Sequence, residues 1–140
     1  MRENFGIFKG KRVDNGQWVQ GNYLHLKGGP VDPDMHFIVT EDGQYNKCFP
    51  ESVCEYTGVR DKNGVMLFEN DVIESKELRL SIRYDSSVAG YCAFDSEHNI
   101  PYIIDSDEEG KVPNYTYIGN EYNVPFDLKS VQIGFSDLEV

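Results

Sequence analysis

The chain has few cysteines and no long apolar run, and both features limit the classes of protein to which it can belong. Its three cysteines, Cys48, Cys54 and Cys92, are an odd number without CxxC spacing. This argues against a disulfide framework and against a zinc site. No segment reaches the roughly 20 apolar residues of a membrane span, and the N-terminus lacks the apolar region of a signal peptide. We therefore expect a protein of the reducing cytoplasm.

The chain is also poor in basic residues. Lys and Arg number 13 against 24 Asp and Glu, which gives a net charge of −11. Residues 1–70 carry 8 basic and 10 acidic residues, whereas residues 71–140 carry 5 and 14. Such an acidic surface repels nucleic acid and anionic membranes, so we expect neither as a direct partner. The acidic second half either keeps the protein soluble or faces a basic partner.

The sequence motifs of common enzymes are absent. The sequence has no GxSxG, no GxGxxG, and no GxxxxGK followed by Ser or Thr. Serine-hydrolase, dinucleotide-binding and P-loop functions therefore have no support. The histidines His25, His36 and His98 are scattered singly, whereas a metal site needs several converging ligands. We predict a protein that is not an enzyme, with no cofactor and no catalytic, cofactor-binding or metal-binding residues.

One acidic loop resembles the start of a calcium-binding loop. Asp105, Asp107, Glu109 and Gly110 match the early positions of an EF-hand. That motif requires a bidentate Glu at its twelfth position, where this chain has Thr116 in an expected strand. We therefore do not expect calcium binding of the EF-hand type.

The residues that are abundant indicate β structure. Nine Tyr, eight Phe and 13 Gly accompany short segments separated by turn signals, and no segment has the apolar period of a long helix. The expected extended segments are residues 5–13, 17–26, 36–40, 44–49, 55–59, 65–68, 71–75, 78–84, 88–95, 100–104 and 115–119, with one helical turn at 50–53 and a short turn near Pro125. Residues 129–140 are expected to be one more strand or a docking segment. Short strands at this spacing are typical of a sandwich or barrel.

Local signals refine this prediction at three places. Asn15-Gly16 between two strands predicts a hairpin with a type I′ turn. In the following strand, Trp18, Tyr23, Leu24 and Leu26 are expected to be buried, and Gly21 is expected to mark a bulge or bend. In 78–84, alternation predicts one shared face for the residues Leu78, Leu80, Ile82 and Tyr84.

Three segments resemble known family motifs. Residues 50–73 read PESVCEYTGVRDKNGVMLFENDVI, residues 16–25 read GQWVQGNYLH, and residues 117–128 read YIGNEYNVPFDL. In this order they resemble the YopX family of phage and prophage proteins, and together they span most of the chain. The family usually has Gly where this chain has Asn70, and Asn is the residue that best replaces Gly in left-handed backbone.

The resemblance implies a mainly β fold of short antiparallel strands with little helix. It implies an N-terminal β region, including the family hairpin, and a C-terminal part akin to a small SH3-like barrel. The change in charge near residue 70 sets the expected boundary, with the N-terminal β region over 1–70 and the acidic barrel over 71–140, in one compact unit. The resemblance also implies a phage or prophage product that works in the cytoplasm of a bacterial host. It implies no particular reaction.

The family-motif residues are predicted to have mainly structural roles. They are Tyr56, Gly58, Asp61, Asn63, Gly64, Glu69, Asp71, Gly119 and Asn120. Gly58 and Gly64 permit special backbone angles, and Asp61 and Asn63 can bond to the backbone of their own turn. Asp71 is expected to hold the turn before the first strand of the barrel.

Three functions are compatible with these features. The first is a non-enzymatic phage accessory protein that binds an unknown host or phage protein, alone or as a homo-oligomer. The second is an acidic mimic of nucleic acid that occupies a host DNA-binding protein. The third is an enzyme whose site has no recognisable sequence pattern.

Overall fold

The computed structural model describes residues 7–95 and 101–122, and these residues form a mainly β protein. The chain divides into two compact units by its internal contacts, Met1–Tyr56 and Thr57–Val140. This division lies earlier in the chain than the boundary at 70/71 that the sequence suggests. Strand β5 crosses the division, so its first residues belong to the first unit and its last residues to the second. His98, the turn near Pro125 and the strand at 129–140 lie outside the described residues.

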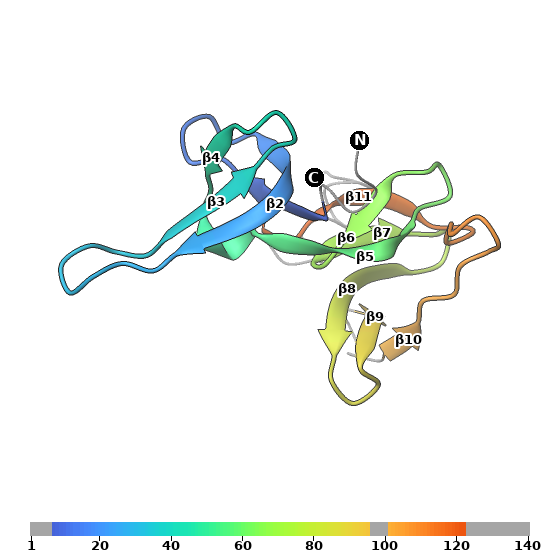
Figure 1. Ribbon diagram of the computed structural model, residues 1–140. Coiled ribbons are helices and arrows are strands. Elements are labelled where there is room, and N and C mark those ends of the chain that lie inside the picture. The colour runs from blue at the N-terminus through green and yellow to red at the C-terminus, as the bar shows by residue number, and fades with distance from the viewer. Residues whose placement is uncertain (1–6, 96–100, 123–140) are drawn as a thin grey trace, which may run out of the picture. The chain divides into compact units, whose positions relative to one another are not determined.

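The first unit is an antiparallel sheet in the order β4-β3-β2-β1-β5. Its strands are β1 (Phe8–Lys11), β2 (Trp18–Leu26), β3 (Met35–Val39), β4 (Tyr45–Lys47) and the start of β5 (Cys54–Arg60). A single 3-10 turn, η1 (Pro50–Ser52), precedes β5, with Pro at the first helical position as predicted. The paired ends of β2 and β3 extend beyond β1 and β4 as a two-stranded ribbon (Figure 1).

The predicted hairpin between β1 and β2 is present, but its turn is not type I′. That type requires positive φ at both central residues, and only Gly16, at φ 71°, has it. The loop is longer than two residues, because the Arg12 N–H donates to the Gln17 carbonyl at 2.9 Å. The Asn15 side chain accepts a bond from the Gln17 N–H instead of adopting left-handed backbone.

The core of the first unit is small and depends on two glycines. A side-chain carbon at Gly10 would lie 3.0 Å from the Cys48 sulfur. At Gly21 it would lie 2.2 Å from the Val39 carbonyl oxygen. Of the bulge or bend expected at Gly21, a bulge is not present, because the register with β1 is regular up to this residue. Gly is needed here for the close approach of a neighbouring strand.

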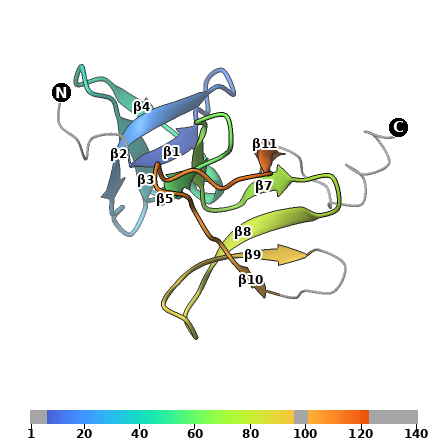
Figure 2. The same ribbon diagram turned by 90° about the vertical axis from the view of Figure 1, so that its right-hand side faces the viewer.

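The second unit contains an antiparallel sheet in the order β10-β9-β8-β7-β11 (Figure 2). Its strands are β7 (Asp71–Glu74), β8 (Arg79–Asp85), β9 (Gly90–Asp95), β10 (Pro101–Ile103) and β11 (Thr116–Asn120). The end of β5 and β6 (Met66–Phe68) form a hairpin in the same unit. The sheet does not close among the described residues, because β10 and β11 are its two edges. The SH3-like barrel expected for this part is therefore not confirmed.

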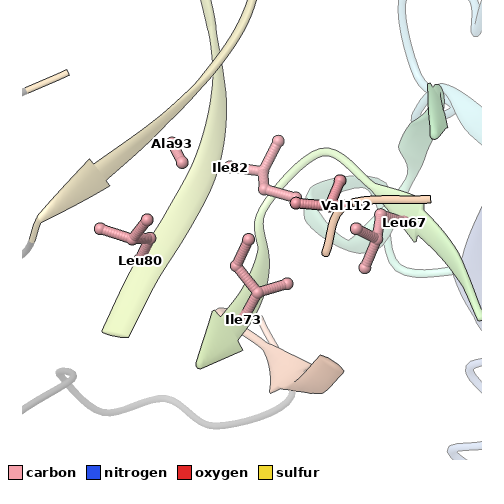
Figure 3. Close-up of a cluster of buried hydrophobic side chains, with 6 residues drawn as sticks. All are labelled: Leu67, Ile73, Leu80, Ile82, Ala93 and Val112. Atoms are coloured by element: carbon pink, nitrogen blue, oxygen red, sulfur yellow. The ribbon is translucent and has the colours of Figure 1, made fainter. Parts of the chain in front are cut away.

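One apolar cluster holds the second unit together. Figure 3 shows its six buried side chains, Leu67, Ile73, Leu80, Ile82, Ala93 and Val112. They come from four strands and from the segment before β11, so residues far apart in sequence share one core. Burial of this many aliphatic groups is the main driving force for such a unit.

The alternation predicted for β8 holds only in part. Leu80 and Ile82 are buried, but Tyr84 is 53% exposed at the end of the strand. Ser81, on the opposite face, is also buried, and its hydroxyl donates to the Glu121 carboxylate. The strand is therefore covered on both faces at its centre, which a simple two-residue period does not anticipate.

Candidate functional site

Asp61 is the centre of the family turn between β5 and β6. Its side chain is 1% exposed, and one carboxylate oxygen accepts the N–H groups of Asn63 and Val65 at 2.8 and 2.9 Å. The other oxygen accepts the Tyr117 N–H of β11 at 3.0 Å. A buried carboxylate requires such donors. Asp61 thus forms its own turn and connects it to β11.

Three residues of the same motif have left-handed backbone. Gly58 and Gly64 have φ values of 94° and 90°, and Asn70 has 72°. Left-handed backbone is costly for most side chains, and Gly and Asn tolerate it best. Asn70 therefore provides a left-handed turn just before β7.

A second buried carboxylate, Asp71, begins β7. One of its oxygens accepts the Phe68 N–H at 2.7 Å, and the other accepts the side-chain amide of Asn120 at 2.9 Å. Asp71 and Asn120 are both 0% exposed. This pair fastens the turn between β6 and β7 to the end of β11.

The remaining motif residues also lie in the scaffold. Tyr56 is half-buried in β5, where its N–H donates to the Ile7 carbonyl at 2.6 Å. The Glu69 carbonyl accepts from the Asn120 side chain at 3.4 Å, and Gly119 follows a register shift in β11. The structure thus brings most of the motif residues of the second unit to its turns and to β11, where their polar groups bond to the main chain.

Two other surfaces are better candidates for a functional site, and the first is the outer face of the first sheet. Cross-strand pairs Leu24 with Phe37 and Leu26 with Met35 place these side chains on one face, and the Phe37 ring lies edge-on to Tyr45 at 6.0 Å. We call these five residues the apolar face. Tyr45 is 62% exposed, Leu26 42% and Met35 37%. Leu26 was expected to be buried, but it is exposed. It lies in the part of β2 that pairs with β3 alone, beyond the ends of β1 and β4.

The opposite face of the same ribbon carries a row of polar rings. His25 and His36 are cross-strand neighbours that stack at 4.4 Å between centroids. The Tyr23 hydroxyl lies 2.6 Å from the His36 Nδ1, and His25 Nε2 lies 2.9 Å from the Asp34 carboxylate. The Gly28 N–H and then His25 lower the pKa of Asp34, whereas burial raises the pKa of Tyr23.

The second candidate surface is a groove of about 800 Å³ within the second unit. Lys62 and Lys76 line it from two turns, and Thr116 and Ile118 line it from β11. Its lining combines cationic, acidic, hydroxyl and apolar groups. We call this concavity the second-unit groove.

No group of three or more His, Cys, Asp or Glu is arranged to hold a metal ion in the described part of the chain. Cys48, Cys54 and Cys92 are buried thiols, and burial raises the pKa of Cys48 and of Cys92. In the acidic loop, Asp107 accepts the N–H groups of Glu109 and Lys111 at 2.9 and 3.0 Å. These bonds form a turn around Gly110, whose φ is 80°.

Several carboxylates of the acidic second half are paired. Glu74 binds Arg79, Glu121 binds Arg83, and Glu109 lies 3.5 Å from Lys111. Within residues 7–95 and 101–122, no helix is long and apolar enough to cross a membrane.

The sequence pattern contained a signal for the apolar face, but it was taken to predict burial, and Leu26 is exposed. Alternate residues of β2 and β3 are apolar, and alternation says that they share a face without saying whether that face is covered. The groove left no signal, because its residues come from three segments that only the tertiary structure brings together.

Comparison with known proteins identifies the family. A search of curated proteins finds no match. The family model described as YopX protein matches residues 8–129, which is most of the chain and includes all three motif segments. The chain therefore belongs to the YopX family.

Proposed function

We propose that this protein is a non-enzymatic accessory protein that acts by binding another protein through the apolar face. The observation that carries this proposal is the exposure of Tyr45, Leu26 and Met35 on one face of a sheet, with Phe37 in ring contact with Tyr45. Exposed apolar patches of this kind often mark protein interaction sites. Covering them removes apolar surface from water, at roughly 25 cal/mol per Å².

The composition of the apolar face also favours a protein partner. Tyr, Met and Phe are enriched at protein interfaces, and Tyr offers a large contact area at a low cost in conformational entropy. Leu24 and Phe37, on the same face, are half-buried and continue the apolar surface between the exposed residues. We further propose a phage or prophage origin and action in the bacterial cytoplasm, in agreement with the family resemblance and with three cysteines that remain thiols.

Fewer observations support the two alternative functions, an acidic mimic of nucleic acid and an enzyme. An acidic mimic of nucleic acid needs carboxylates that are available on the surface, and Glu74 and Glu121 are already bound to arginines. A general acid or base needs a carboxylate that can exchange a proton with a substrate. Asp61 and Asp71 are buried and accept bonds from the protein itself.

Affinity capture from infected or lysogenic bacteria tests the proposal. The tagged protein is compared with a variant that carries Leu26→Glu and Tyr45→Glu, and captured proteins are quantified by mass spectrometry. We expect a specific partner whose recovery falls at least tenfold in the variant. The control is Val88→Glu, which also charges an exposed apolar residue but lies in the second unit.

Equal recovery of every protein by the variant and by the unaltered chain would contradict a role for the apolar face. Light scattering of the purified protein distinguishes self-association: a dimer that the two substitutions dissociate would identify a second copy as the partner. Retention of the folded state is checked by circular dichroism for each variant.

A further inference from the structure

We propose that the second-unit groove binds an extended acidic peptide segment. This is a second binding site, separate in sequence from the apolar face. It rests on the position of two lysines, on the local balance of charge, and on the apolar residues in the lining of the groove.

Both lysines are carried by turns with fixed backbones. The Lys62 N–H donates to the Tyr115 carbonyl at 3.1 Å, and this bond holds the β5–β6 turn beside the start of β11. Lys76 lies in the β7–β8 turn, where the Ser75 hydroxyl accepts the Leu78 N–H at 3.1 Å. The two cationic side chains are exposed and approach the groove from different turns.

The charge of the groove is opposite to that of the chain. Glu74 lines the groove but is bound by Arg79, which leaves Glu77 as the uncompensated carboxylate of the lining. Neither Lys62 nor Lys76 forms an ion pair with another described residue. With Glu74 offset by Arg79, two lysines face one carboxylate, which leaves a local excess of one positive charge in a protein of net charge −11. Such complementarity favours an anionic ligand and disfavours a basic one.

The shape and the other lining groups favour a peptide over a small anion. The groove has about 800 Å³, which exceeds what one phosphate or carboxylate can fill. Ile118 and Tyr115 add apolar groups to the lining, and Thr116 adds a hydroxyl. An extended chain with alternating side chains can place acidic groups on the lysines and an apolar group on Ile118.

Nuclear magnetic resonance titration of the full-length, ¹⁵N-labelled protein tests this proposal. The probe is a capped peptide of sequence Glu-Glu-Ile-Glu-Glu, and the amide signals of Lys76, Thr116 and Ile118 report on the groove. We expect saturable shifts of these signals that weaken at high salt, since exposed charge pairs are screened. Lys62→Glu and Lys76→Glu should each weaken binding at least threefold. Lys27→Glu, an equal change of charge in the first unit, should leave it unchanged.

Three results would each overturn the proposal. The first is the absence of saturable shifts, and the second is a loss of affinity in Lys27→Glu as large as that in Lys62→Glu or Lys76→Glu. The third is equally strong binding of the matching Lys-Lys-Ile-Lys-Lys peptide. Inorganic phosphate that saturates the same signals at a lower concentration than the acidic peptide would assign the groove to small anions instead. Thermal melting checks the fold of each variant, and Gln replaces Glu at Lys62 or Lys76 if the charge reversal unfolds the protein.

Discussion

The side-chain amide of Asn120 donates to the carboxylate of Asp71 at 2.9 Å, across 49 residues of sequence. Both side chains are fully buried, and both belong to the segments by which the family is recognised. The bond joins β7 to β11, and the Asn70 carbonyl also accepts the Glu121 N–H at 2.8 Å. The family motif near residue 70 and the motif near residue 120 thus form one structural feature.

Asp71→Ala should destabilise the protein by about 3 kcal/mol, because buried donors on Phe68 and Asn120 lose their acceptor. Urea unfolding followed by circular dichroism measures the change in the free energy of unfolding. Glu77→Ala, which removes an exposed carboxylate, is the control and should change it little. A loss below about 1 kcal/mol for Asp71→Ala would contradict a structural role for this pair.

Asp61→Asn should cost about 1–3 kcal/mol, since an amide cannot accept at both of its ends. The three donors to Asp61 require two accepting oxygens. Hydrogen exchange of the Tyr117 amide reports directly on the bond to β11 and should become faster. Unchanged protection of that amide would show that Asp61 does not hold β11.

Gly64→Ala should cost about 1–2 kcal/mol from backbone strain alone, because no atom lies within 4 Å of the added carbon. Asn70→Gly should stay within about 0.5 kcal/mol of the unaltered protein, since both residues tolerate left-handed backbone. Thermal unfolding of both variants measures the difference. Gly29→Ala is the control, because its site is open and needs no left-handed backbone. Equal stability of all three variants would refute the argument from backbone angles.

The pKa of Asp107 is below its ordinary value, because the Lys111 N–H and then the Glu109 N–H stabilise the carboxylate. A lowered pKa means that this group stabilises the turn above the ordinary carboxyl pKa of about 3.9, and that the effect is lost as the pH falls through the lowered pKa. Carboxyl ¹³C titration of the folded protein should give a lower midpoint than titration in urea. An equal or higher midpoint in the folded protein would contradict these bonds.

Most strands could be predicted from local signals in the sequence. The burial of individual residues and the bonds between distant segments could not. The turn residues Asp61 to Gly64 and the run at 78–84 identified a hairpin and a strand correctly. The burial of Ser81 and the exposure of Leu26 were not predictable, because each depends on which distant segment covers the strand. The site residues Asp61 and Asp71 were recognisable as turn formers, but their bonds to Tyr117 and Asn120 were not.

The sequence by itself determined the β class, the positions of the turns and the membership of the YopX family. These depend on residues close together in the chain, where Gly, Asn and Asp restrict the backbone directly. The tertiary structure alone decided that the second sheet stays open within the described residues, that the apolar face is exposed and that two lysines line one groove. Each of these follows from contacts between distant segments, and a local pattern of residues contains no information on which segments meet.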